Sequence, residues 1–273
     1  MKKLLLLLAS TVVTFVLPGC FQSETTIHLN KDGSGTLVEE FRLGAQMVAM
    51  IAQLSAIGGP DADADPFARQ FSEEKAKKRA TELGKGVTLE KFEPLNDEGN
   101  KGARVTYQFK DINELQVSPD DGMKNISAMG DAQAPAGEKK HPIGFSFADG
   151  KLTIRMPQPE QADAAAGPED QKPGMPDMDD PEAQAMVKEM MGDLKMSVKV
   201  VIEPGIDETN ASHQKDNTIT LVELNMGKLV KNADNLKKLS TVDQKDPIAA
   251  MNSLKGIEGM KFEVEREVVV QLK

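Results

Sequence analysis

Oxygen-bearing side chains recur at alternate positions after residue 29, a spacing that could bind calcium. Asn30, Asp32 and Ser34 match the first, third and fifth ligand positions of a calcium-binding loop, and Gly35 matches its required glycine. The bidentate glutamate that completes such a loop is missing, because Phe41 stands at its place. Asp-Gly also favours a tight turn between strands. The segment therefore predicts a hairpin turn in preference to a calcium site.

Two further sets of residues carry groups that bind metals. Asp61, Asp63 and Asp65 resemble part of a calcium loop, but Pro66 replaces the glycine, so a solvated acidic loop is the simpler interpretation. The second set is a group of methionines: Met175, Met178, Met186, Met190, Met191 and Met196. Converging thioethers can bind Cu(I), whereas methionines at helical spacing also fill cores. We expect core filling and no bound metal.

The remaining candidates for catalysis show no recognisable pattern. The histidines are far apart in the sequence: His28, His141 and His213. No paired-histidine zinc motif, no Gly-x-Ser-x-Gly and no glycine-rich phosphate loop before a helix is present. Carboxylates are the only abundant reactive groups, so a hydrolase with dispersed acidic residues is the enzymatic alternative. We expect a non-enzymatic binding or interaction module without a cofactor; metal handling by the methionines or acidic loops is the other alternative.

Cys20 is the only cysteine and ends a secretion signal. Lys2 and Lys3 precede an apolar stretch that closes with Leu17-Pro18-Gly19, which predicts a cleaved signal peptide over residues 1–19. Residues 17–20, Leu-Pro-Gly-Cys, resemble the bacterial lipobox, which is cleaved directly before its cysteine. That resemblance implies a lipid on the Cys20 sulfur and an envelope protein anchored to a membrane. Phe21 in place of aspartate implies the outer membrane, facing the periplasm, in a bacterium with two membranes.

The charge of the chain limits its partners. The net charge is −10, and removal of a leader that holds two lysines and no acid leaves −12. A protein this acidic repels nucleic acid and anionic lipid headgroups. We therefore expect membrane attachment through the lipid on Cys20 alone, and a protein, glycan or lipid as the further partner.

Alternation of apolar and polar residues predicts an α+β fold with a mainly antiparallel sheet built from hairpins. The expected hairpins cover residues 26–43, 87–109 and 143–155, and further strands cover 196–202, 218–224 and 262–272. Helices are expected at residues 47–57, 72–84, 186–194 and 246–254. Residues 20–156 and 182–273 flank an acidic linker or loop at 157–181. They form either two lobes or one domain with a long insertion.

Charged residues on apolar faces are a further signal. Glu39 interrupts the apolar face of its strand, and Arg266 falls on the apolar face of the strand expected at 262–272. A buried arginine needs an acidic partner, so Arg266 predicts a structural ion pair or an edge position, with an anion contact in a cleft as the alternative. The helix at 72–84 is expected to begin at the N-cap Ser72 and to expose three basic residues, Lys77, Lys78 and Arg79.

Residues 26–36, Thr-Ile-His-Leu-Asn-Lys-Asp-Gly-Ser-Gly-Thr, follow closely after the anchor cysteine. This arrangement resembles a broad set of uncharacterised bacterial lipoproteins, among them the mycobacterial LppM-type domains. The resemblance covers about the first quarter of the mature chain. It implies a strand and hairpin after the anchor, and no particular activity.

Overall fold

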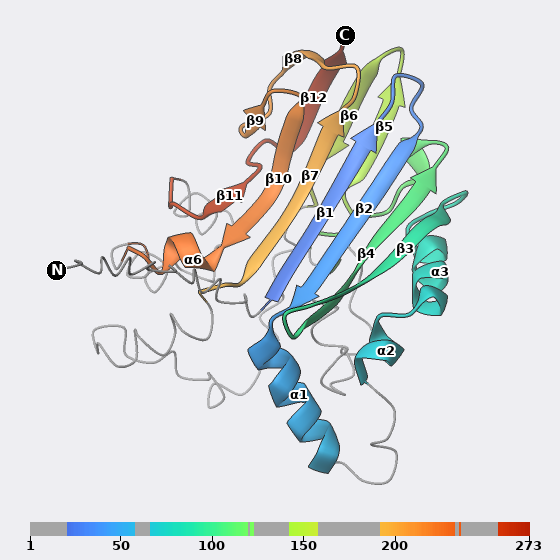
Figure 1. The fold of residues 1–273 in the computed structure, drawn as a ribbon. Coiled ribbons are helices and arrows are strands. Elements are labelled where there is room, and N and C mark those ends of the chain that lie inside the picture. Colours follow the sequence, from blue (N-terminus) through green and yellow to red (C-terminus); the bar gives the residue numbers. More distant parts are fainter. Residues whose placement is uncertain are drawn as a thin grey trace, which may run out of the picture.

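Two β-sheets form the framework of the described residues, as the computed structural model shows (Figure 1). The structure describes residues 21–57, 66–119, 121–122, 142–157, 192–232, 235 and 256–273. The first sheet has eight strands in the order β11-β10-β7-β1-β2-β4-β3, with β9 paired to β10, and the second has four in the order β5-β6-β12-β8. Among these pairs only β1 and β7 run parallel. The expected α+β, mainly antiparallel architecture is confirmed.

The strands of the first half of the chain form three hairpins, as expected. They are β1 (Phe21–Leu29), β2 (Gly35–Leu43), β3 (Thr88–Asp97), β4 (Asn100–Phe109), β5 (Gly144–Ala148) and β6 (Lys151–Arg155). Local turn chemistry explains each connection. Asp149 and Gly150 have positive φ between β5 and β6, and Glu98 and Gly99 do so between β3 and β4.

The strands of the second half are β7 (Lys195–Ile202), β8 (Ile206–Thr209), β9 (Gln214–Lys215), β10 (Thr218–Asn225), β11 (Met260–Phe262) and β12 (Glu267–Leu272). They join strands of the first half in both sheets. β7 pairs with β1, and β12 pairs with β6. Residues on either side of the 157–181 segment therefore depend on one another for their hydrogen bonds. The segment itself lies outside the described residues, as do the helices expected at 186–194 and 246–254, apart from residues 192–194.

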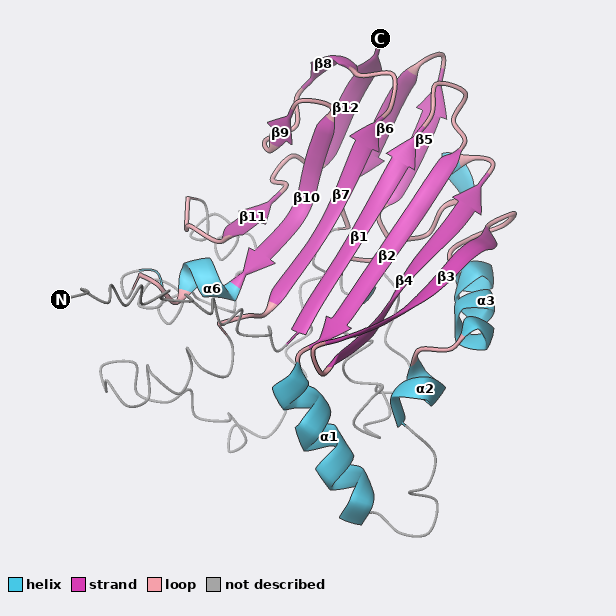
Figure 2. Cartoon of the chain, in the orientation of Figure 1, coloured by secondary structure: helices cyan, strands magenta, loops and turns pink. Residues whose placement is uncertain are grey.

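Helices are few among the described residues (Figure 2). They are α1 (Ala45–Ile57), α2 (Pro66–Gln70), α3 (Glu73–Glu82), the 3-10 turn η1 (Ile112–Glu114) and α6 (Met226–Leu229). The helices expected at 47–57 and 72–84 are confirmed. α1 extends from the end of the large sheet where β1 begins and β2 ends (Figure 1).

The main core lies between the two sheets and under α3. One cluster of buried side chains includes Ile27 of β1, Val200 of β7, Ile154 of β6 and Val270 of β12, together with Ala80 of α3. All five are nearly inaccessible to solvent. Because the cluster draws on both sheets, burial of aliphatic surface holds them face to face.

The strand expected at residues 262–272 is broken in two. β11 ends at Phe262 in the large sheet, and β12 begins at Glu267 in the small one. The buried Glu263 explains the break, because its carboxylate accepts backbone N–H bonds from Val264, Glu265 and Ser212, each at 2.9 Å. Those bonds replace a strand ladder.

Arg266 consequently does not lie on an apolar face. It occupies the bend before β12, and its side chain is exposed. Arg266 was expected in an ion pair or at an edge position; its placement on an apolar strand face was wrong, and a buried ion pair is excluded because the side chain is exposed. Two short strands were not predicted: β8 and β9 lie between β7 and β10, where the sequence pattern indicated no strand.

Candidate functional site

A pocket of about 300 Å³ lies between α3 and the strands β2, β4 and β3. Its apolar lining comes from three phenylalanine rings, two alanines, a valine and the single tyrosine: Phe41, Phe71, Phe92, Ala76, Ala103, Val105 and Tyr107. Its polar lining comes from Glu39, Gln70, Ser72, Lys75, Lys78, Arg79 and Glu82. A concave surface of this size with apolar walls and a few polar groups is typical of small-molecule sites.

α3 supplies one wall of the pocket, and its sequence explains its position. Ser72 caps the helix, since its hydroxyl accepts a hydrogen bond from the Lys75 amide at 3.3 Å. Glu73 and Glu74 in the first turn interact favourably with the helix dipole. The small buried Ala76 and Ala80 let the helix approach the sheet closely.

A largely buried ion cluster adjoins the pocket, and two of its members, Glu39 and Arg79, line it. The Arg79 guanidinium donates to Glu39 Oε1 from Nη2 at 2.8 Å and to Asp121 Oδ2 at 2.7 Å. Asp121 Oδ2 also accepts the Ser118 amide at 2.9 Å. The side chains of Arg79, Glu39 and Asp121 are 21%, 19% and 13% exposed, respectively. Burial alone would lower the pKa of Arg79, but the carboxylates of Glu39 and Asp121 outweigh it and raise that pKa.

Tyr107 of β4 lies beside this cluster and is almost fully buried. Burial is the main cause that raises the pKa of its phenol, and the negative charge of Glu39 adds to it. The hydroxyl therefore stays protonated at neutral pH. It donates no hydrogen bond to any residue that the structure describes.

We predict that Tyr107 will not ionise near pH 10, the usual value for tyrosine, while the protein is folded. Tyr107 is the only tyrosine and the chain has no tryptophan, so tyrosinate absorbance reports this site alone. Because the folded pKa is raised, its stabilising contribution is present below about pH 10 and lost as the pH rises further. An alkaline titration followed by absorbance and circular dichroism should show ionisation and unfolding together. Ionisation at about pH 10 in a folded protein would contradict this.

The cluster is suited to positioning and binding, and less to acid–base chemistry. Two carboxylates converge, as a hydrolase would need, but the Arg79 guanidinium lies between them and hydrogen-bonds to both. Both carboxylates are thereby engaged in structural hydrogen bonds. The phenol of Tyr107 is a neutral donor. The pocket can therefore accept an apolar body and hydrogen-bond to one acceptor atom.

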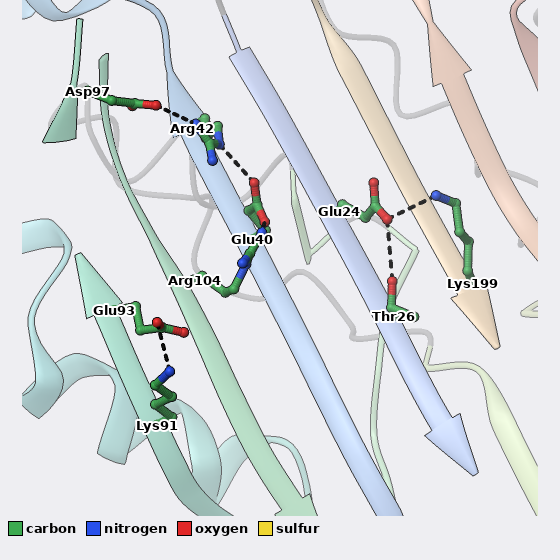
Figure 3. Close-up of polar contacts among 9 residues, drawn as sticks. All are labelled: Glu24, Thr26, Glu40, Arg42, Lys91, Glu93, Asp97, Arg104 and Lys199. Atoms are coloured by element: carbon green, nitrogen blue, oxygen red, sulfur yellow. Dashed lines mark hydrogen bonds and ion pairs between the residues drawn. The ribbon is translucent and has the colours of Figure 1, made fainter. Parts of the chain in front are cut away.

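The opposite face of the large sheet is polar and carries ion pairs that run from strand to strand (Figure 3). Lys199 Nζ of β7 lies 2.9 Å from Glu24 Oε1 of β1, and Arg42 Nη1 of β2 lies 3.0 Å from Asp97 Oδ2 of β3. Arg104 binds Glu40 Oε2. A second hollow, of about 220 Å³, lies on this face. Its carboxylates already hold cations, so it is a weaker candidate for a ligand site.

Other residues that the sequence singled out are placed as follows. The segment from Asn30 is a hairpin turn, as predicted: Asp32 Oδ1 accepts hydrogen bonds from the Ser34 hydroxyl at 2.6 Å and the Ser34 amide at 3.0 Å. These bonds hold the pKa of Asp32 below its usual value. His28 lies on the polar sheet face, with Nδ1 2.8 Å from Glu203 Oε1. His213 lies in the loop before β9.

Several candidates lie outside the described residues: Cys20, Asp61, Asp63, Asp65, His141, Met175, Met178, Met186, Met190 and Met191. Met196 is buried in β7, as expected of a core methionine. Among the described residues, no group of three or more His, Cys, Asp or Glu is arranged to hold a metal ion. None of the described helices is long and apolar enough to cross a membrane.

Sequence reasoning missed the arginine that is buried. Arg79 was expected on the exposed side of its helix, but it points toward the sheet and is paired there. A signal for it was present, because Glu39 stands on the apolar face of β2 between the buried Leu37 and Phe41. An acid in that position needs a cation from a neighbouring element.

Comparison with known proteins adds little to this site. No family model and no curated protein matches the chain. Among solved structures, the folded domain of LppM from Mycobacterium tuberculosis, determined by NMR, is similar at 9% identity and a TM-score of 0.28, over 78% of this chain and 86% of that one. A TM-score this low does not establish a shared fold.

Proposed function

We propose that this chain is a non-enzymatic binding protein, held at a bacterial envelope membrane by a lipid on Cys20, that takes a small ligand in the pocket beside α3. The observation that carries the binding role is the juxtaposition, in one pocket, of aromatic walls with the phenol of Tyr107, whose raised pKa keeps it protonated. The expected ligand has an aromatic or short acyl body and one hydrogen-bond acceptor.

The Arg79 cluster supports binding by fixing the shape of the pocket. Arg79 ties α3 to β2 through Glu39, and to the segment after η1 through Asp121. Three elements that are distant in the sequence are thereby held around one hollow. A pocket whose walls are fixed before a ligand arrives loses less entropy on binding.

The binding role can be tested with anilinonaphthalene sulfonate, an aromatic probe with an acidic group. We expect saturable binding that quenches the emission of Tyr107. Phe92→Glu places a charge in the aromatic wall and should weaken probe binding roughly tenfold, because it removes apolar contact. Thr88→Glu places the same charge on β3 outside the pocket lining and should have no effect. Equal affinities in both variants would overturn the assignment of the pocket.

The anchor is tested separately by mass spectrometry of the native N-terminus. We expect a chain that begins at Cys20 and carries acyl groups, two or more of which are needed for stable attachment. An uncleaved start at Met1, or a free Cys20 thiol on a processed chain, would overturn the anchor. Neither result would alter the pocket.

A further inference from the structure

α1 is an apolar helix at the end of the large sheet where the described chain begins. Phe21, the first described residue, pairs in register with Leu43 of β2, and α1 starts two residues later at Ala45. Cys20 directly precedes Phe21 in the sequence. The start of α1 therefore lies close to Phe21, the residue that directly follows the proposed anchor.

The composition of α1 separates it from the rest of the chain. Residues 43–60 contain no charged side chain, although 28% of the chain is Asp, Glu, Lys or Arg. At that average a stretch of this length would carry about five charges. An exposed helix in a protein of net charge −10 would ordinarily carry charges on its outer side.

Only part of α1 is covered by the described protein. Met47, Val48 and Ile51 pack against a cluster that contains Phe21 and Phe41. Other positions on the helix face outward. Met50 is 49% exposed, and it is the one large hydrophobic residue among those described that is exposed. Figure 1 shows the helix extending away from the sheet. The exposed positions over residues 45–53 carry no charge; they are Gln46, Ala49, Met50, Ala52 and Gln53.

We propose that α1 lies in the interface of the same bilayer that receives the lipid on Cys20, with Met50 directed toward the acyl chains. The proposal rests on the anchor proposed above. Acyl chains on Cys20 bring the adjacent end of the sheet to the membrane surface, and α1 leaves from that end. Its thirteen residues span about 20 Å, too short to cross a bilayer but suited to lying in the interface.

The chemistry of α1 fits a neutral lipid surface better than an anionic one. Interfacial helices that bind anionic lipids carry lysine and arginine on the polar face, and α1 has neither. The contact would therefore be hydrophobic and insensitive to salt. It would also fix the orientation of the sheets relative to the membrane, which a flexible lipid tether alone cannot do.

The test uses the full, processed protein with a single new thiol. Lipidated Cys20 cannot react with a maleimide, so an environment-sensitive fluorophore can be attached to Met50→Cys alone. The labelled protein is placed in phosphatidylcholine vesicles that contain nitroxide lipid. The matched control is Lys31→Cys, an exposed position in the turn at the far end of β1, about 30 Å away along nine residues. A second position, Ala49→Cys, is also exposed on α1.

We expect the nitroxide lipid to quench the labels at positions 50 and 49 several-fold more than the label at 31, at low and high salt alike. Equal quenching at all three positions would overturn the proposal. A blue-shifted label at 50 without lipid quenching would show protein covering α1, and would also overturn it. If the parent chain itself takes up the label at Cys20, the anchor has failed, and that result is distinct from either outcome at α1.

Discussion

Replacing Arg79 by Met should lower the free energy of unfolding by about 3 kcal/mol. The substitution keeps the length and apolar stem of the side chain but removes the guanidinium. Glu39 and Asp121 then face the same space without a cation, and both are largely buried. Leaving charges buried and unpaired is strongly destabilising. Urea denaturation followed by circular dichroism would measure the loss.

Two controls separate this effect from a general loss of charge on α3. Lys77→Met removes a cation from the same helix, but both Lys77 and its partner Glu73 are exposed. The free energy of unfolding should therefore change by no more than about 0.5 kcal/mol. Combining Arg79→Met with Glu39→Gln and Asp121→Asn removes all three charges. That variant should be more stable than Arg79→Met alone. Similar losses for Arg79→Met and Lys77→Met would show that the cluster contributes little.

The sequence indicated that a buried arginine would need an acidic partner, but it did not indicate that this arginine is Arg79. A buried arginine needs an acid, and the sequence pointed to Arg266 because residues 262–272 alternate like one strand. The alternation is interrupted by Glu263, whose carboxylate binds the amide of Ser212, fifty-one residues away in the sequence. No local pattern reports such a contact. Arg79 was hidden for the same reason, since its partner Glu39 is forty residues away.

Local turn and cap chemistry, by contrast, predicted most of the elements that build the pocket. The hairpins depend on residues such as Gly99 and Gly150, whose positive φ suits the turns they form. The start of α3 depends on Ser72. The parallel pairing of β1 with β7 and the division of strands between two sheets depend on contacts over long sequence separations. Periodicity gives the face of a strand but not its partner, so the pocket could not be assembled from the sequence.

Gly84→Ala should destabilise the protein by about 3 kcal/mol or more, for a reason that differs from that of Arg79→Met. Gly84 follows Leu83, the C-cap of α3, with a φ of +133°, and a Cβ there would collide with the backbone oxygen of Glu114. The neighbour is backbone and cannot rotate away. Thermal or urea unfolding of the variant would measure the loss.

Gly86→Ala is the control for substitution at a positive φ, because Gly86 also has a positive φ but lacks the collision. Gly86 has a φ of +80°, and a Cβ there would meet nothing within 4 Å. Its substitution should cost about 1 kcal/mol, the usual penalty for a left-handed alanine. Equal losses at the two glycines would show that the segment around Glu114 moves aside easily.

The position of Gly84 connects this prediction to the pocket. The amide of Gln116 donates to the carbonyl of Leu83 at 2.7 Å, and Gly84 forms an antiparallel β-bridge with Leu115. These backbone contacts connect the end of α3 to the segment that leads to Asp121. A side chain at Gly84 would push that segment away from the helix. Asp121 would then withdraw from Arg79, and Gly84→Ala should weaken probe binding in the pocket, whereas Gly86→Ala should leave it unchanged.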